Sequence, residues 1–283
     1  MTALRRVFKI PTRPLHTCLR GALSFVCVML VAIGIAEVGH AQEDGFKSIF
    51  NGKDLSGWKG NPKLWSVEDG AITGTTTAED PLKFNTFLVW QDGLVSNFEL
   101  ELDYRIGDEG NSGIQYRSTV FDEERFIVGG YQADIDASMK FAGINYEEKG
   151  RGILAQRGMQ TTFSKDGKKT SKKVGDAEEL GAKIKKGEWN RYRIVADGPR
   201  VSHYINGELM SEVIDHQVGT AEQRLKKYAK VSGTKVSAAK RKEIEAGAAK
   251  VGESSQEGVL ALQIHVGPVM KIQFKNIKIK TLD

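Results

Sequence analysis

Polar side chains that could do chemistry recur at every second position along several segments of the chain. Residues 97–106 alternate strictly, with apolar side chains on one side and charged side chains on the other. Residues 112–118, 131–136 and 259–266 show the same period of two, which is typical of β-strands. The outward set comprises Glu99, Glu101, Asp103, Arg105, Gln115, Arg117, Gln132, Asp134, Asp136, Gln263 and His265. If these strands are neighbours, these side chains share one face.

This mixture of groups is suited to binding a sugar. Carboxylates, amides and guanidinium groups can bind vicinal hydroxyls, and an aromatic ring such as Trp90 or Tyr146 can stack on a sugar face. The alternative is a solvated face with ordinary cross-strand ion pairs. That alternative is weaker for one polar set, because polar outward positions on several strands are more than solubility requires. The set comprises Gln115, Arg117, Gln132, Asp134, Gln263 and His265.

Two local features strengthen the expectation of a ligand-binding site. Residues 110–113 read Gly-Asn-Ser-Gly, whose glycines permit close backbone approach and whose Asn111 offers a short polar arm, although a plain turn would look the same. His265 stands in Gln-Ile-His-Val-Gly-Pro, at a strand end before a turn, where ligand sites are common. By contrast, we expect His203, in a hairpin arm, to lie at the surface.

Several chemistries have no motif in this chain. It contains no phosphate-binding loop, no dinucleotide fingerprint, no HExxH and no GxSxG. The sequence therefore does not establish any cofactor. A divalent cation held by His265 with Asp134 or Glu101 is conceivable, but no ligand spacing demands it.

The elements that must position these groups are short strands joined by tight turns. About a dozen such strands are separated by Asn-Gly and Asp-Gly dipeptides, as in the hairpin around Asn206-Gly207. This predicts an all-β, jelly-roll β-sandwich. Residues 161–186, rich in Lys, Gly and Ser, are expected to form a loop. Residues 220–256, rich in Ala, Lys and Glu, are expected to form a helical surface insertion, solvated or used for protein interaction.

The N-terminal sequence predicts that the protein is exported. Residues 1–41 combine five arginines or lysines, an apolar run and small residues at Gly39 and Ala41, which is the pattern of a cleavable signal peptide. An uncleaved membrane anchor is the alternative, but the apolar run is shorter than the roughly 20 residues that a spanning helix needs. We expect a periplasmic or secreted domain of residues 42–283, with no membrane partner after cleavage.

Cleavage would also change the composition. The chain has 41 Lys and Arg against 36 Asp and Glu, and its formal net charge is +5. Without residues 1–41, the balance becomes 36 against 35, which gives no support to a nucleic-acid partner. Both cysteines, Cys18 and Cys27, are lost as well, so a hydrophobic core must stabilise the domain without disulfides.

A series of motifs in the chain resembles the 3-keto-disaccharide hydrolase domain family, in forms common in planctomycete-type bacteria. The matches run in order from residue 46 to the C-terminus. They include FKSIFNGKDLSGW at 46–58, WSVEDG at 65–70, GNSGI at 110–114, GYQADI at 130–135, EWN at 188–190 and FKNI at 274–277. Residues 220–256 depart from the family pattern, because they interrupt a link that is normally short.

The resemblance implies a concanavalin A-like jelly roll that cleaves glycosides already oxidised to a ketone at sugar C3. A C3 ketone acidifies the C2 hydrogen, so a base can start an elimination across C1–C2 that water addition completes. We expect Asp134 or His265 to be the base and Glu101 to assist the leaving group. The expected substrate-binding residues are Arg105, Asn111, Gln115, Arg117, Gln132 and Gln263. A non-catalytic, lectin-like carbohydrate-binding domain is the alternative.

Overall fold

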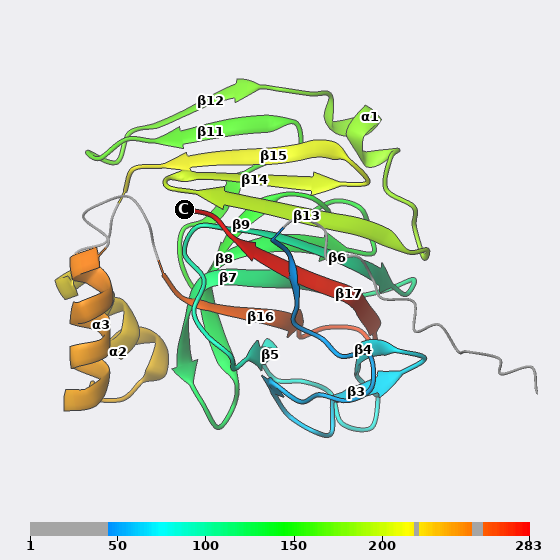
Figure 1. Ribbon diagram of the computed structural model, residues 1–283, viewed down its shortest axis with the longest axis horizontal. Coiled ribbons are helices and arrows are strands. Elements are labelled where there is room, and N and C mark those ends of the chain that lie inside the picture. Colours follow the sequence, from blue (N-terminus) through cyan, green and yellow to red (C-terminus); the bar gives the residue numbers. More distant parts are fainter. Residues whose placement is uncertain (1–44, 218–220, 251–256) are drawn as a thin grey trace, which may run out of the picture. The chain divides into compact units, whose positions relative to one another are not determined.

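Alternating apolar residues build a strand in the middle of the larger sheet. In β6 (Phe98–Ile106) every second side chain is buried, from Phe98 to Ile106, and the residues between them lie on the opposite face. The computed structural model describes residues 45–217, 221–250 and 257–283. Within these residues, the strands form two sheets that pack as a β-sandwich around a shared hydrophobic core (Figure 1). The predicted all-β fold is therefore confirmed.

The larger sheet has ten strands within the described residues. All its neighbouring pairs are antiparallel except β11 with β15, which is parallel. In spatial order, the strands are β12 (Lys169–Lys173), β11 (Met159–Phe163), β15 (Glu208–Asp215), β14 (Arg200–Ile205), β13 (Asn190–Asp197), β6, β17 (Lys271–Thr281), β4 (Ala71–Thr75) and β3 (Trp65–Glu68), with β1 (Lys47–Ser48) beside β17.

The smaller sheet has seven strands within the same described residues, and all its pairs are antiparallel. In spatial order, they are β10 (Gly152–Ala155), β9 (Asn145–Glu148), β8 (Ile127–Asp136), β7 (Asn111–Asp122), β16 (Val259–Ile264), β5 (Thr86–Trp90) and β2 (Trp58–Lys59). Thus β7, β8 and β16 are neighbours, as the site prediction requires, whereas β6 belongs to the other sheet.

The core between the sheets contains a buried histidine. His203 of β14 has an exposed fraction of 0%, and its Nε2 lies 2.8 Å from the hydroxyl of Tyr116 across the sandwich. Its Nδ1 faces the backbone oxygen of Ile144 at 3.3 Å. Burial lowers the pKa of His203 to about 3, so the ring is neutral. The expectation that His203 lies at the surface is wrong, because its arm of the hairpin is covered by the other sheet.

The tip of the β7–β8 hairpin folds over the outer face of its own sheet. The backbone N–H of Phe87 in β5 donates to the oxygen of Phe126 at 3.1 Å, although β5 lies two strands away from β7. Apolar side chains of the hairpin pack there in a second, smaller core with outward residues of β5 and β16: Phe87, Val89, Val120, Val128, Val259 and Ala261. The hairpin therefore covers part of this outer face.

Residues 161–186 contain regular structure, so the expectation of a loop is wrong. They include the end of β11, the edge strand β12 and the short helix α1 (Ala177–Gly181). All five side chains of β12 are exposed, and three are lysines. Such a strand is stabilised by backbone pairing rather than by burial, and lysines are common on edge strands. The hydrophobic pattern therefore could not reveal it.

The expected insertion is helical in its described part. It contains α2 (Ala221–Ser232) and α3 (Ala238–Lys250), which Figure 1 shows side by side. Residues 218–220 and 251–256 lie outside the described residues, as does the expected signal peptide at residues 1–41. Among the described residues, no helix has the length and apolar character needed to cross a membrane.

Candidate functional site

Strands β7, β8 and β16 bring five of the predicted residues onto one face. Alternation directs Asn111, Gln115, Gln132, Asp134 and Gln263 to the outer side of the smaller sheet, where Gln115 pairs with Gln132 across the strands. We call these five residues the polar floor. The floor is deeply placed, since Asp134 is only 5% exposed.

Hydrogen bonds hold the carboxyl group of Asp134 in place. Gln132 Nε2 donates to Asp134 Oδ1 at 3.0 Å, and Asn111 Nδ2 donates to the same oxygen at 3.4 Å. Gln115 Nε2 donates in turn to Gln132 Oε1 at 2.6 Å. Gly113, which faces Asp134 in the strand pair, makes room for this chain, because a Cβ there would lie 2.6 Å from the Gln132 side chain. The floor is therefore preorganised around one carboxyl group.

Burial sets the protonation of that carboxyl group. The pKa of Asp134 is raised to about 8, mainly by desolvation and to a smaller extent by the negative charges of Asp136 and Glu148, although the two amide hydrogen bonds lower it. A carboxyl group with this pKa can both hold and release a proton near neutral pH. Such a pKa suits a general acid or base.

Gln263 contributes an amide without a partner. Its side chain is 0% exposed, and neither its nitrogen nor its oxygen forms a hydrogen bond with any described residue. Buried polar groups in folded proteins nearly always have a partner, because leaving one unpaired costs about 1–3 kcal/mol. An unpaired amide held in this way within the polar floor is suited to form hydrogen bonds with a ligand.

The wall of the site contains Tyr146, a proposed stacking residue, and two residues that the sequence did not point to, Glu148 and Asn85. Tyr146 pairs with Gln132, and the pKa of its hydroxyl is raised by desolvation and by the nearby charges of Glu148 and Asp134. Glu148 is buried, and its Oε1 accepts a hydrogen bond from Asn85 Nδ2 at 3.4 Å. The alternation of Tyr146 and Glu148 along β9 could have identified both, but Asn85 lies outside any regular strand.

His265 follows β16 at the end of the strand and is partly exposed. Its Nδ1 lies 2.5 Å from the backbone oxygen of Val266, which can only accept, so Nδ1 donates this hydrogen bond. The backbone N–H of Val266 donates to Asn85 Oδ1 at 2.9 Å. Asn85 thus connects the strand end that carries His265 to Glu148.

The structure places Glu101 and Arg105 away from the polar floor. Both lie on β6, and they face outward from the larger sheet, so the whole core separates them from Asp134. Glu101 forms ion pairs with Arg191 at 3.3 Å and Lys278 at 3.2 Å. Arg105 donates to Gln273 at 2.7 Å. Glu101 thus takes part in ion pairs, and Arg105 in a hydrogen bond, on the outer face of the larger sheet.

Arg117 is close to the floor in sequence but has a different role. A bulge after Tyr116 breaks the alternation, and Arg117 adopts a φ of 48°. Its guanidinium group donates to the backbone oxygens of Ser96 at 2.6 Å and Gly198 at 2.8 Å, and to Asn97 Oδ1 at 3.1 Å. Through these bonds, the guanidinium group connects β7 to turns of the larger sheet. Arg117 is therefore not available to bind a sugar in the floor.

Two other expectations concern the stacking aromatic residues and a cation site. Trp90 is buried in the main core, so of the two proposed stacking residues only Tyr146 lies on the outer face. In the described part of the chain, no three His, Cys, Asp or Glu side chains gather closely enough to hold a metal ion. The conceivable pairing of His265 with Glu101 is excluded, because the two residues belong to opposite sheets.

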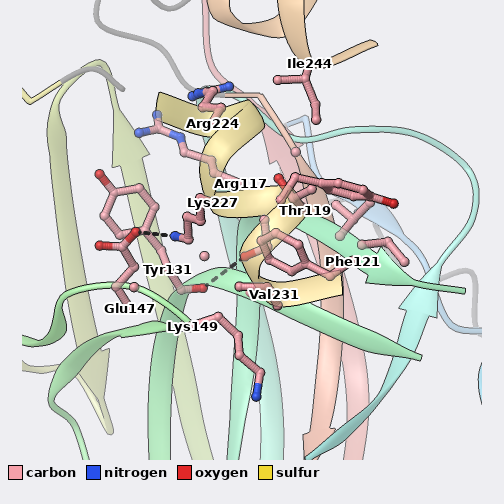
Figure 2. A pocket seen from close by; sticks show the side chains of 18 of the residues that line it. Arg117, Thr119, Phe121, Tyr131, Glu147, Lys149, Arg224, Lys227, Val231 and Ile244 are labelled. Carbon is pink, nitrogen blue, oxygen red and sulfur yellow. Dashed lines mark hydrogen bonds and ion pairs between the residues drawn. The ribbon is translucent and has the colours of Figure 1, made fainter. Parts of the chain in front are cut away.

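A concave region lies between the insertion and the end of the sandwich, apart from the polar floor. This cleft has a volume of about 1060 Å³ and is lined by α2, α3, the base of the β7–β8 hairpin and the turn after β9 (Figure 2). Lys227 of α2 forms an ion pair with Glu147 of β9 at 2.9 Å across it. This cleft has no signature in the sequence, because it depends on how the insertion packs against the sandwich.

Comparisons with known proteins agree with the resemblance noted in the sequence. Residues 45–280 match the 3-keto-alpha-glucoside-1,2-lyase-like domain family. A 3-keto-disaccharide hydrolase from Bacteroides thetaiotaomicron is 35% identical over 82 residues. That alignment covers 26% of this chain and 27% of the relative, so the chain matches about a quarter of the relative's length.

Solved structures show similar folds at low sequence identity. A protein from Parabacteroides distasonis, named provisionally as a glycosyl hydrolase, is 24% identical with a TM-score of 0.46, over 84% of this chain and 94% of that one. The carbohydrate-binding module CBM66 from Bacillus subtilis is 14% identical with a TM-score of 0.44, over 80% of this chain and 96% of that one. Because both TM-scores are below 0.5, we infer nothing about the site from them.

Proposed function

The chain belongs to the 3-keto-alpha-glucoside-1,2-lyase-like family, and from that premise we propose that it cleaves 3-keto-glycosides at the polar floor. The observation that carries the proposal is the buried carboxyl group of Asp134, held by Gln132 and Asn111. A base of this kind is what the reaction needs, since the C3 ketone makes the hydrogen on C2 acidic. No strong nucleophile is required.

The proposed reaction begins with removal of the C2 hydrogen as a proton. Asp134, in its carboxylate form, takes that proton, and the electron pair moves to the C3 oxygen as an enolate. The enolate then expels the substituent at C1, forming a C1–C2 double bond and restoring the ketone. The departing oxygen takes up a proton. Water finally adds across the double bond, with its hydroxyl at C1 and its hydrogen at C2, so that the net reaction is hydrolysis.

Residues of the floor and the wall supply the other roles. The unpartnered amide of Gln263 is suited to donate a hydrogen bond to the enolate oxygen, where preorganised donors contribute most to rate. Glu148 takes the leaving-group role first expected of Glu101, because it lies on the same side of the sheet as Asp134. Tyr146 can stack on the sugar ring. His265 remains the alternative base through its Nε2.

The proposal is tested with a 3-keto-glucoside carrying deuterium at C2. The mature protein, residues 42–283, should release the aglycone, and the deuterium should slow the reaction if proton removal limits it. Recovery of the released 3-keto sugar from H₂O with hydrogen at C2 would support elimination and hydration. Release of the aglycone with the label fully retained at C2 would contradict elimination. Binding without any release would instead favour a carbohydrate-binding domain.

We also propose that the domain acts outside the cytoplasm. The proposal rests on the signal-peptide pattern in residues 1–41. Expression of the full chain in a Gram-negative host, followed by N-terminal sequencing of the periplasmic protein, should find a new terminus at Gln42. A full-length chain retained in the membrane fraction would contradict cleavage.

A further inference from the structure

The insertion concentrates positive charge in a protein that is otherwise nearly neutral. Its described part, residues 221–250, contains nine lysines and arginines but three glutamates. Residues 42–283 as a whole contain 36 basic and 35 acidic side chains. The rest of this region is therefore net acidic, and the positive charge of the insertion is a local feature.

Specific contacts hold the insertion against the sandwich. Besides the Lys227–Glu147 ion pair, the ring of Tyr228 in α2 lies 5.6 Å from the ring of Phe121 in β7. Ile244 of α3 is buried at the same cleft. Figure 2 shows Lys227 directed at Glu147 from the helix above the sheet. The cleft between these elements is thus a defined cavity with walls from both parts.

The cleft is lined by more positive than negative groups. Nine lysines and arginines and four glutamates line it within the described residues. Six of the nine cations bond to acidic or backbone groups, as Lys227 and Arg151 do. Lys165, Arg224 and Lys230 form no hydrogen bond or ion pair with any described residue. Positive charge without a counter-charge therefore remains in the cleft.

Arg224 is the most informative of these three. Its side chain is half-buried, so the guanidinium charge is partly removed from water, and this burial lowers its pKa against a smaller opposing effect of Tyr131. A desolvated charge with no partner costs free energy, and an anion that binds beside it offsets that cost. Guanidinium groups bind carboxylates and sulfates through paired, charge-assisted hydrogen bonds.

The cleft and the polar floor meet at the end of β9. Glu148 belongs to the wall of the floor, and the next residue, Lys149, lines the cleft and pairs with Glu148 at 3.6 Å. Gly130, which pairs with Glu148, lines the cleft as well. A saccharide chain that occupies the floor can therefore extend into the cleft.

We propose that this cleft binds the anionic group, carboxylate or sulfate, of an acidic oligosaccharide, with Arg224 as the principal contact. The volume of about 1060 Å³ is at the upper end of ligand pockets, which run from about 300 to 1000 Å³, so it can hold more than one sugar unit. That the ligand is a sugar rests on the proposed function; that it is anionic rests on the charges of the cleft alone.

Binding by residues 42–283 tests the proposal without requiring turnover. Isothermal titration calorimetry would compare an oligogalacturonate, a sulfated galactan oligosaccharide and a neutral galacto-oligosaccharide of equal length. One or both anionic sugars should bind at least about tenfold more tightly than the neutral one. The two anionic arms distinguish carboxylate from sulfate. Equal affinity for all three would overturn the proposal, and so would binding of polyglutamate but of neither anionic sugar.

Matched variants locate the contact. Arg224→Gln should remove most of the anionic preference, about tenfold, and Arg224→Lys should retain part of it. Lys242→Gln makes the same change of charge at an exposed position of α3 that does not line the cleft, and it should change affinity less than about twofold. Equal losses from Arg224→Gln and Lys242→Gln would show diffuse attraction and overturn the site.

Two outcomes with the wild-type protein separate this inference from the proposed function. If wild-type protein binds these sugars but cleaves no 3-keto-glycoside, only the proposed function fails. If it cleaves 3-keto-glycosides without any preference for anionic sugars, only the present inference fails.

Discussion

Gln132 Nε2 donates a hydrogen bond to Asp134 Oδ1 at 3.0 Å, and both side chains are buried on the outer side of the smaller sheet. This relationship places a carboxyl group where water has little access. The free energy of hydration that the carboxylate loses there is what raises its pKa to about 8. The first consequence concerns stability rather than activity.

Asp134→Asn is expected to stabilise the protein, and more so as the pH rises from about 4 to 8. The pKa in the folded state, about 8, is above the unfolded value of about 3.9, so between these values the folded state binds the extra proton and stability falls as pH rises. Asparagine does not titrate and resembles the protonated acid. Urea unfolding should show a gain of roughly 1–3 kcal/mol at pH 8 and little gain at pH 4.

Asp136→Asn provides the control for this measurement. Asp136 Oδ2 accepts hydrogen bonds from the hydroxyl of Ser138 at 2.6 Å and from the backbone of Phe141 at 2.9 Å. Its amide variant should therefore destabilise the protein at pH 8, by about 1–2 kcal/mol. A destabilising effect of Asp134→Asn at pH 8 would contradict the assignment of a buried, largely protonated acid.

Gln263→Leu should lower the activity of the protein without lowering its stability. Leucine has a similar size and removes an amide that has no partner among the described residues, so stability should stay within about 1 kcal/mol of wild type or rise. If the amide stabilises the enolate, kcat on a 3-keto-glucoside should fall about 10²–10³-fold. Gln115→Leu is the contrast: it breaks the bond to Gln132 and should destabilise the fold by about 1–3 kcal/mol.

Glu101→Gln and Glu148→Gln test which glutamate serves the reaction. Glu101 is ion-paired on the far face of the other sheet, so its variant should keep kcat/KM within about twofold and stability within about 0.5 kcal/mol. Glu148→Gln should lower kcat at least about tenfold. Steady-state kinetics on one 3-keto-glucoside distinguish the two, and a large loss in Glu101→Gln alone would refute the assignment.

Arg117→Gln tests the structural role of that guanidinium group. It should destabilise the protein by about 2–4 kcal/mol, since two backbone oxygens and Asn97 lose a charged donor. Thermal melting measures this loss. At a temperature where the variant stays folded, its kcat should remain within about threefold of wild type. A loss of activity without a loss of stability would instead indicate that Arg117 takes part in the reaction or in substrate binding.

Much of the fold and part of the site could be predicted from the sequence. A period of two identifies which side chains of one strand share a face, so Gln115, Gln132, Asp134 and Gln263 were placed correctly. The period does not say which strands are neighbours. Glu101 follows the same pattern as Asp134, yet long-range pairing puts β6 in the other sheet.

The remaining differences arise where local rules are broken. The bulge at Arg117 reverses the direction of a side chain that alternation would place in the floor. The buried position of His203 depends on a partner, Tyr116, that is 87 residues away in sequence. The cleft at Arg224 exists only because an insertion packs against the sandwich end. None of these is encoded in a short window of sequence.

The most direct test of the account is the pH dependence of kcat/KM for wild type and Asp134→Asn on a 3-keto-glucoside. With Asp134 as the base, the wild-type value should rise as the pH increases toward about 8 and then level off. The variant should lose about 10²–10⁴-fold and no longer follow that rise. An Asp134→Asn protein that keeps full activity and the wild-type pH profile would contradict the central claim that this buried carboxyl group starts the reaction.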